Sequence, residues 1–208
     1  MATITALTTQ KRNAERINVF LDGQFAFGLA AIAATGLRVG QSLSAEEITT
    51  LQRKDDYEKA RKSALHLISR RPRSAEEIKR NLHKKAFDDL LIVQVVDDLT
   101  AAKLLDDQAF AAYWVEQRET FKPRSRLGLR QELRQKGVPH QIIEDALEQV
   151  DEESAARRVA EKQAWRWNQL SEDEYRVKLS RFLQRHGFPY DVIVETTNVT
   201  WQTLNEEH

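Results

Sequence analysis

The chain has 208 residues, with 32 Lys and Arg balanced by 32 Asp and Glu, and it contains no cysteine. The absence of cysteine excludes disulfides, thiol nucleophiles and thiolate metal sites, and it is compatible with a reducing compartment. No apolar run approaches the roughly 18–20 residues that a membrane-spanning helix needs. We therefore expect a soluble cytoplasmic protein of one large or two small domains, with no membrane partner.

Residues 1–56 differ from the rest of the chain because they are rich in β-prone runs. These runs predict three short strands, at Ile4–Thr9, Ile17–Leu21 and Gln24–Leu29. Asp22-Gly23 between the last two is a strong hairpin signal, because glycine accepts a positive φ. We expect a small antiparallel sheet, a short helix through Ala34, and another helix capped by Ser44.

From Tyr57 onward the pattern is helical, and it repeats. The phrase from Arg73-Ser74 to Lys85-Ala86-Phe87 returns 51 residues later as Arg124-Ser125 to Lys136-Gly137-Val138. A looser copy ends at His186-Gly187-Phe188, after a further 50 residues. A fixed period of this size indicates tandem copies of one supersecondary unit.

Each copy is predicted to contain three helices with the general form of a helix-turn-helix. The predicted helices are 57–69, 74–85 and 88–102, then 107–120, 125–136 and 139–150, then 152–169, 173–185 and 189–200. The fold class is therefore mainly α, with three tandem three-helix repeats in an elongated crescent after the β segment. The predicted domains are residues 1–56, repeat 1 (57–105), repeat 2 (106–151) and repeat 3 (152–208).

The third helix of each repeat sets the register. An apolar stripe in repeat 1 recurs at the same positions in repeat 2: Ile92, Val95, Val96 and Leu99, then Ile143, Ala146, Leu147 and Val150. In repeat 3 these positions are Ile193 and three threonines, Thr196, Thr197 and Thr200. The stripe is expected to fail there, so that repeat 3 is a degenerate cap with a partly extended tail.

Glycines are expected to close the middle helices. Gly137 and Gly187 occupy the position after a helix where a left-handed residue is favoured. Ala86 holds that position in repeat 1, and the same geometry there costs roughly 1 kcal/mol.

Nothing in the sequence forms a catalytic constellation, so we expect neither an enzyme nor a cofactor or metal site. The chain has no phosphate-binding loop, metalloprotease motif or nucleophile elbow. The pairs Asp97-Asp98 and Asp106-Asp107 are best explained as a solvated helix end and a helix cap.

Basic side chains are the best candidates for a binding site. Arg126, Arg130 and Arg134 recur every four residues and share one helix face. Lys122 and Arg124 precede that face, and its counterpart in repeat 1 comprises Arg70, Arg71, Arg73 and Lys79. The alternative is an ordinary solvated face, which composition alone favours.

The tryptophans divide between core and surface roles. Trp114 lies between apolar neighbours and is expected in the core. Trp165 and Trp167 could stack on bases or pack on a partner, but we expect at least one of them in the core.

Several stretches together resemble the RecX family, the bacterial regulators of the RecA recombinase. They are Arg70-Arg71-Pro72-Arg73-Ser74 with Leu82, Asp107-x-x-Phe110-Ala111, Glu132-Leu133-x-x-Lys136-Gly137-Val138, and Phe182-Leu183-x-x-His186-Gly187-Phe188-x-x-Asp191. The run Arg16–Gly23 is similar to the β extension of some members. Ala86 in place of the usual Gly is a departure that touches turn geometry.

The resemblance implies a non-enzymatic regulator of homologous recombination, DNA repair and the SOS response. It implies binding to the RecA–DNA filament, usually with inhibition of RecA, and we expect weaker phosphate contacts to DNA and a monomeric chain. The alternatives are a nucleic-acid-binding protein that acts without RecA and a generic helical scaffold. Acidic third helices, such as the one that carries Asp88, Asp89, Asp97 and Asp98, argue against sequence-specific reading of a DNA groove.

Overall fold

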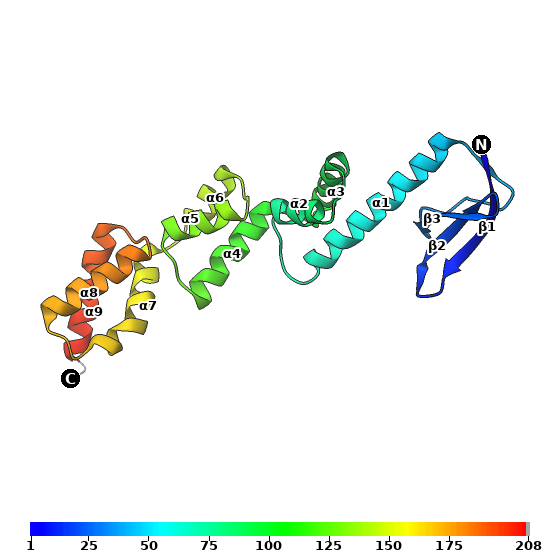
Figure 1. Cartoon of the computed structure of the whole chain (residues 1–208). Helices are drawn as coiled ribbons and strands as arrows, with labels where there is room; N and C mark the ends of the chain where they lie inside the picture. The colour runs from blue at the N-terminus through cyan, green and yellow to red at the C-terminus, as the bar shows by residue number, and fades with distance from the viewer. Residues whose placement is uncertain (207–208) are drawn as a thin grey trace. The chain divides into compact units, whose positions relative to one another are not determined.

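The computed structural model describes residues 1–206, and its element labels are those of Figure 1. The chain forms two compact bodies. The first body contains Met1–Arg71 and Ile78–Leu104, and the second contains Pro72–Glu77 and the chain from Leu105 onward. Each body is described by itself.

A four-stranded antiparallel sheet opens the first body. Its strands are β1 (Ala2–Gln10), β2 (Asn13–Leu21), β3 (Gln24–Ala30) and β4 (Ser42–Leu43), in the order β3-β2-β1-β4. The predicted hairpin is confirmed, because Asp22 and Gly23 both have positive φ, at 49° and 85°. The short helix expected through Ala34 is wrong. This segment forms turns that end at Gly36 with φ at 95°, too short a run to propagate a helix.

Helix α1 (Ala45–Ile68) is a single helix of 24 residues. It begins with the capping box of Ser44 and Glu47, so the predicted Ser44 cap is confirmed. The prediction of a separate helix starting at Tyr57 is wrong, because no Gly or Pro interrupts the helix between Ala45 and Ile68. The domain boundary predicted at residue 56 falls inside α1.

Asp55 joins α1 to the sheet. Its carboxylate is 3% exposed and accepts hydrogen bonds from both terminal nitrogens of Arg16 at 3.1 and 3.0 Å, and from the Ala30 N–H at 2.6 Å. Lys59 adds an ion pair at 2.7 Å. Burial raises the pKa of the Asp55 carboxyl, but these hydrogen bonds and charges outweigh burial and hold the pKa below its ordinary value.

The three predicted helical repeats are confirmed. Their elements are α2 (Ala75–Lys84), α3 (Asp89–Ala101), α4 (Asp107–Phe121), α5 (Arg126–Gln135), α6 (His140–Leu147), α7 (Glu152–Ala164), the 3-10 turn η1 (Trp165–Trp167), α8 (Glu172–Arg185) and α9 (Tyr190–Glu206). Repeat 1 ends with α2 and α3, repeat 2 contains α4 to α6, and repeat 3 contains α7 to α9.

The third helices bury the same register of positions in all three repeats. Ile193, Thr196, Thr197 and Thr200 of α9 are all buried, as are all four stripe residues of α3 and, in repeat 2, Ile143, Leu147 and Val150. Thr200 satisfies its hydroxyl within the helix by donating to the Thr196 carbonyl at 2.7 Å. The expected failure of this stripe and the partly extended tail are therefore wrong, because threonine keeps a methyl group for packing once its hydroxyl is bonded.

A buried serine fastens the start of one middle helix to the end of the next. Ser74 Oγ donates to the Lys136 carbonyl at 2.6 Å and accepts from the Glu77 N–H. Ser125 Oγ likewise donates to the His186 carbonyl at 2.8 Å and accepts from the Gly128 N–H. Both serines are 0% exposed. We call this contact the serine joint, and both of its copies lie within the second body.

The serine joint explains which repeats need glycine. Gly137 and Gly187 have φ of 76° and 82°, and a Cβ at Gly137 would lie 2.2 Å from the Glu76 Cγ. A Cβ at Gly187 would lie 2.8 Å from the Ser125 Oγ. Ala86 has the same left-handed backbone, with φ at 59°, but its side chain is exposed. Repeat 1 therefore tolerates alanine at position 86, because no serine joint packs against this residue.

Helix α8 has no serine joint, and a different side chain takes the place of the serine. The residue fifty positions after Ser125 is Tyr175. It lies inside α8 and does not precede it, because α8 starts a turn earlier than the alignment of its C-terminal end predicts. Tyr175 is 0% exposed, and its ring lies 5.1 Å from that of Trp201. An aromatic pair thus occupies the position that serine holds in repeats 1 and 2.

Replacing Gly137 with Ala is expected to destabilise the second body by about 2–4 kcal/mol, from left-handed strain and overpacking together. All four tryptophans lie in this body, so urea unfolding followed by tryptophan fluorescence measures the effect. The matched variant Ala86→Gly removes strain without a clash and should stabilise the first body by about 1 kcal/mol, measured by circular dichroism. A loss of less than about 1 kcal/mol for Gly137→Ala would show that Glu76 moves to accommodate the added methyl group, which would contradict the prediction.

Replacing Asp55 with Asn is expected to destabilise the first body by roughly 3 kcal/mol at pH 7, because Arg16 and Lys59 lose the buried carboxylate charge with which they pair. A carboxyl whose pKa is lowered by folding stabilises the folded state at pH values above its pKa in the unfolded chain, which is near 4. This stabilisation is lost as the pH falls through the pKa of the carboxyl in the folded state. The difference between wild type and Asp55→Asn should therefore shrink below about pH 4 in thermal unfolding followed by circular dichroism. A difference that stays constant down to pH 2.5 would contradict this assignment.

Candidate functional site

The predicted basic residues lie at the starts and on the outer faces of the middle helices α2 and α5. Arg70, Arg71 and Arg73 are in the segment before α2, and Lys79 is on that helix. Lys122 and Arg124 are in the equivalent segment before α5, which carries Arg126, Arg130 and Arg134. Serine N-caps position both helices, so the backbone geometry of the two segments is shared.

Arg124 belongs to a charged network around Trp114. Glu132 of α5 accepts from the Trp114 indole N–H at 2.8 Å and from Arg118 Nε at 2.6 Å, and Arg124 Nε lies 3.5 Å away. The cationic groups of Arg118 and Lys136 lie over the Trp114 ring at 4.6 and 4.7 Å. Trp114 also packs against the core of repeat 2, as expected. Arg124 therefore contributes to holding α4 against α5.

Arg126 closes the end of α6. Its guanidinium donates to the Val150 carbonyl at 2.7 Å and to the Glu148 carbonyl at 3.3 Å, and its backbone N–H donates to Glu152 at 2.8 Å. These carbonyls follow the last turn of a helix, where partial negative charge attracts a cation. Arg126 thus ties α5 to the connection between α6 and α7.

Arg130 forms a two-point ion pair with Glu144 of α6. Its Nε and one terminal nitrogen each donate to a carboxylate oxygen at 2.7 Å. The hydrogen bond from Arg130 holds the pKa of Glu144 below its ordinary value. Two of the three arginines on the predicted helix face, Arg126 and Arg130, are therefore bonded within repeat 2.

Four of the predicted cations form no ion pair within the described residues: Arg70, Lys79, Lys122 and Arg134. Arg70, Lys122 and Arg134 are exposed, and Lys79 is half-buried. Arg73 pairs with Glu77 at 3.8 Å, and Arg71 is half-buried beside it in sequence. The groups available for an anionic partner are thus fewer than the sequence predicts, and they divide between the two bodies.

Repeat 3 carries a further basic surface that the sequence analysis missed. The positions in repeat 3 that correspond to Arg126, Arg130 and Arg134 are Arg176, Ser180 and Gln184, and Arg176 pairs internally with Glu172. The cations lie elsewhere on the same helices: Arg158, Lys162 and Arg166 on α7 and η1, and Lys178, Arg181 and Arg185 on α8. Their spacings of three and four residues were a signal that could have identified them.

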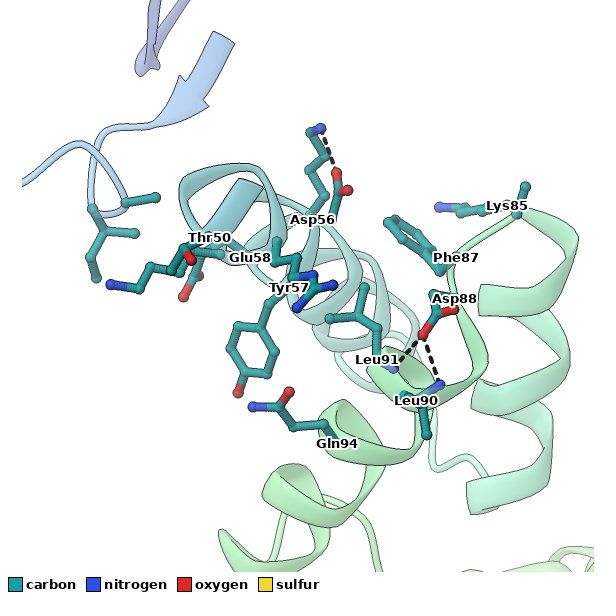
Figure 2. A pocket seen from close by; sticks show the side chains of 16 residues that line it. Thr50, Asp56, Tyr57, Glu58, Lys85, Phe87, Asp88, Leu90, Leu91 and Gln94 are labelled. Atoms are coloured by element: carbon teal, nitrogen blue, oxygen red, sulfur yellow. Dashed lines mark hydrogen bonds and ion pairs between the residues drawn. The ribbon is translucent and has the colours of Figure 1, made fainter. Parts of the chain in front are cut away.

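A cavity of about 1090 Å³ lies in the first body (Figure 2). Tyr57 of α1 and Leu91 of α3 line it, together with Phe87 from the turn between α2 and α3. Asp88 on its edge caps α3 by accepting from the N–H groups of Leu90 and Leu91. Charged side chains, among them Lys54 and Glu58, line it beside these groups.

Within residues 1–206, no cluster of three His, Asp or Glu side chains has the geometry to hold a metal ion. In the same range, no helix is long and apolar enough to cross a membrane.

Four family models match consecutive parts of the chain. The model of the regulatory protein RecX N-terminal domain matches residues 2–44. The models of the first, second and third three-helix domains of RecX match residues 60–99, 106–147 and 151–196.

Relatives and solved structures agree with the family models. Regulatory protein RecX of Clostridium botulinum (strain Eklund 17B) is 34% identical over 200 residues, which cover 93% of both chains. That of Halalkalibacterium halodurans is 36% identical over 204 residues, covering 94% of this chain and 77% of the relative. A crystal structure of regulatory protein RecX matches with a TM-score of 0.76 and 27% identity over 95% of this chain and 100% of that one. RecX from Lactobacillus salivarius matches with a TM-score of 0.63 and 25% identity over 73% of this chain and 97% of that one.

Replacing Arg126 with Met is expected to destabilise the second body by roughly 2 kcal/mol, because the carbonyls after α6 lose a charged donor while the aliphatic stem stays. The matched variant Arg134→Met should change the unfolding free energy by less than about 0.5 kcal/mol, because Arg134 is exposed. Urea unfolding followed by tryptophan fluorescence measures both. Equal losses of unfolding free energy for the two variants would show that Arg126 is no more important for stability than the exposed Arg134.

Proposed function

Because the chain belongs to the RecX family of regulatory proteins, we propose that it binds the RecA–DNA filament and lowers RecA activity without catalysing a reaction itself. The observation that supports this most is the match of all four RecX domains, in order, along one chain. The role would lie in homologous recombination, DNA repair and the SOS response, in the cytoplasm and as a monomer.

The tandem repeats suit a partner that is itself a polymer. A chain with several binding modules gains affinity when its second contact becomes intramolecular, with no new interaction needed. A filament presents the same surface at regular intervals, so successive repeats can contact successive protomers. Such binding would obstruct access of DNA or protein substrates to the filament.

The unpaired cations are the proposed contact residues. We assign direct contact to Arg70, Lys79, Lys122 and Arg134, with Arg71 and Arg73 beside them in the segment before α2. We assign a positioning role to Arg124, Arg126 and Arg130, because their guanidinium groups are bonded to Glu132, to the carbonyls after α6 and to Glu144. Exposed cations attract acidic protein surface or DNA phosphates without an internal pair having to break first.

The alternative is a nucleic-acid-binding protein that acts without RecA. The basic surface of repeat 3 favours it, because Trp165 is 63% exposed among those cations. The two functions are separated by comparing affinity for the filament with affinity for naked DNA at the same salt concentration, since phosphate binding weakens strongly as salt rises.

The direct test is ATP hydrolysis by the cognate RecA on single-stranded DNA, with and without this protein. We expect hydrolysis to fall severalfold as the protein is added, and we expect the protein alone to hydrolyse no ATP. Absence of any effect over a wide concentration range would contradict the proposal.

The contact residues are tested by reversing charge at Lys122 and Arg134 to Glu together. Inhibition should weaken at least tenfold in the required protein concentration, because attraction becomes like-charge repulsion. The control is Lys11→Glu with Arg12→Glu, which makes the same charge change at exposed residues of the hairpin between β1 and β2. Equal inhibition by both double variants would remove Lys122 and Arg134 from the contact surface.

A further inference from the structure

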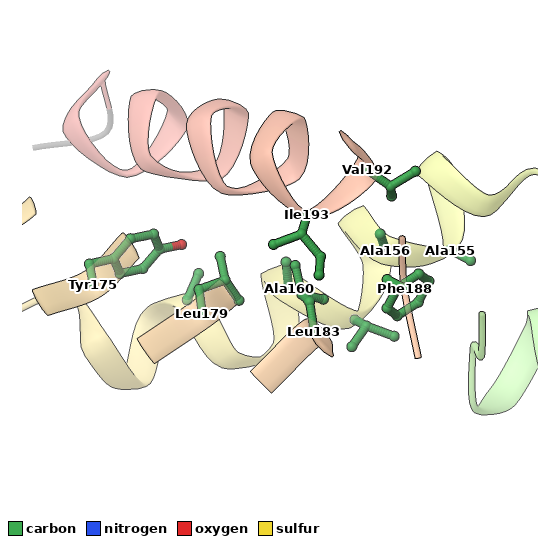
Figure 3. Close-up of a cluster of buried hydrophobic side chains, with 11 residues drawn as sticks. Ala155, Ala156, Ala160, Tyr175, Leu179, Leu183, Phe188, Val192 and Ile193 are labelled. Atoms are coloured by element: carbon green, nitrogen blue, oxygen red, sulfur yellow. The ribbon is translucent and has the colours of Figure 1, made fainter. Parts of the chain in front are cut away.

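The basic surface of repeat 3 lies on the sides of α7 and α8 that face away from α9. Helices α7, α8 and α9 enclose the buried cluster of this repeat, with Ala156, Leu179 and Ile193 at its centre (Figure 3). Arg157 pairs with Glu195 of α9, and Arg176 bonds Asn198 of α9, which marks the sides of α7 and α8 next to α9.

Helical rotation then places Lys162, Lys178, Arg181 and Arg185 on the opposite sides, whereas Arg158 directly follows Arg157 and is half-buried. Lys178 follows Arg176 by two residues, about 200° around α8, and Lys162 follows Arg157 by five, about 140° around α7. Arg181 and Arg185 continue the side of Lys178 at three and seven residues. Lys178 also lies over the Trp167 ring at 5.4 Å, so the two sides meet at η1.

These cations are not neutralised by ion pairs, although the exposed Glu161 directly precedes Lys162. None of the six forms an ion pair within the described residues. Several carboxylates on the same helices have other partners: Glu152 accepts from the Arg126 N–H, Glu172 from Arg176, and Glu174 from Ser171. The surface therefore has a surplus of positive charge that suits an anionic chain.

One tryptophan stands in this surface with its ring accessible. All four tryptophans are among the described residues, and Trp165 alone is exposed, at 63%. Trp167 packs on Phe182 with ring centroids 5.8 Å apart and is held against the core, as expected for one of the pair. The Arg166 guanidinium lies 5.5 Å from the Trp165 ring, which leaves a flat aromatic face beside a cation.

We propose that this face of α7, η1 and α8 is a binding site for single-stranded nucleic acid. Phosphates lie along Lys162, Arg181 and their neighbours, and an unpaired base stacks on Trp165. Stacking on an exposed ring needs a base that is free of its partner strand, so the site favours single strands over duplex. An acidic protein would pair with the cations, but its carboxylates would not stack on the Trp165 ring. The site binds without RecA, so the proposal rests on the alternative function above and not on binding to the RecA filament.

The test measures binding of the full chain to a fluorescein-labelled 20-nucleotide oligo(dT), by anisotropy and without RecA. We expect the single strand to bind at least tenfold more tightly than a duplex of the same length, with quenching of tryptophan fluorescence. Trp165→Ala should weaken single-strand binding 5-fold to 100-fold and remove most of the quenching, whereas duplex binding should change less than twofold. A Trp165→Ala variant that binds oligo(dT) as wild type does would overturn the stacking site.

The charge contribution is tested with Lys162→Glu and Arg181→Glu together. This variant should weaken binding at least tenfold and reduce the slope of log affinity against log salt by about 1.4, the value for two single-strand phosphate contacts. The control is again Lys11→Glu with Arg12→Glu, and circular dichroism confirms folding of each variant. Tighter binding of poly-glutamate than of oligo(dT) would instead identify an acidic protein as the ligand and overturn the proposal. RecA inhibition, measured separately, tests the other function on its own.

Discussion

The serine joint is the contact on which the order of the repeats depends. One buried hydroxyl satisfies two helix ends at once, because it accepts from the first turn of its own helix and donates to a carbonyl just past the next middle helix. Helix ends leave such groups without partners, and a buried carbonyl without a donor costs about 1–3 kcal/mol. Serine is suited to this position because alanine would lack the hydroxyl and threonine would add a methyl group at a site that is 0% exposed.

The joint also accounts for the spacing that is visible in the sequence. Each serine must meet a residue that is left-handed and has no Cβ, which is why Gly137 and Gly187 follow Ser74 and Ser125 at nearly equal distances. Ala86 is free of this requirement, and Tyr175 ends the series by filling the serine position with an aromatic ring. Ala86 and Tyr175 therefore depart from the repeat pattern at positions where no serine joint forms with another repeat.

Local features of this fold are predictable from sequence, and long-range features are not. Helical periodicity and glycine positions predicted the helices of the three repeats, mostly to within a few residues, since these depend on neighbours along the chain. The bond between Asp55 and Arg16 was not predicted, because it joins residues that lie 39 positions apart. The bonds of Arg126 to Val150 and of Arg130 to Glu144 were not predicted, because these partners lie 24 and 14 residues away. A basic stripe can be recognised in a sequence, but its unpaired members cannot.

The distribution of paired and unpaired cations separates structure from binding. In repeat 2 the arginines of the middle helix meet acidic groups or helix ends, so their charge is used within the fold. In repeat 3 the positions of Lys178, Arg181 and Arg185 correspond to Gly128, Gln131 and Gln135 of repeat 2, where no charge is needed for packing. Like charges on one face repel one another and weaken the folded state. A bound negative partner relieves this repulsion, which supports the proposed role of this face in recognition.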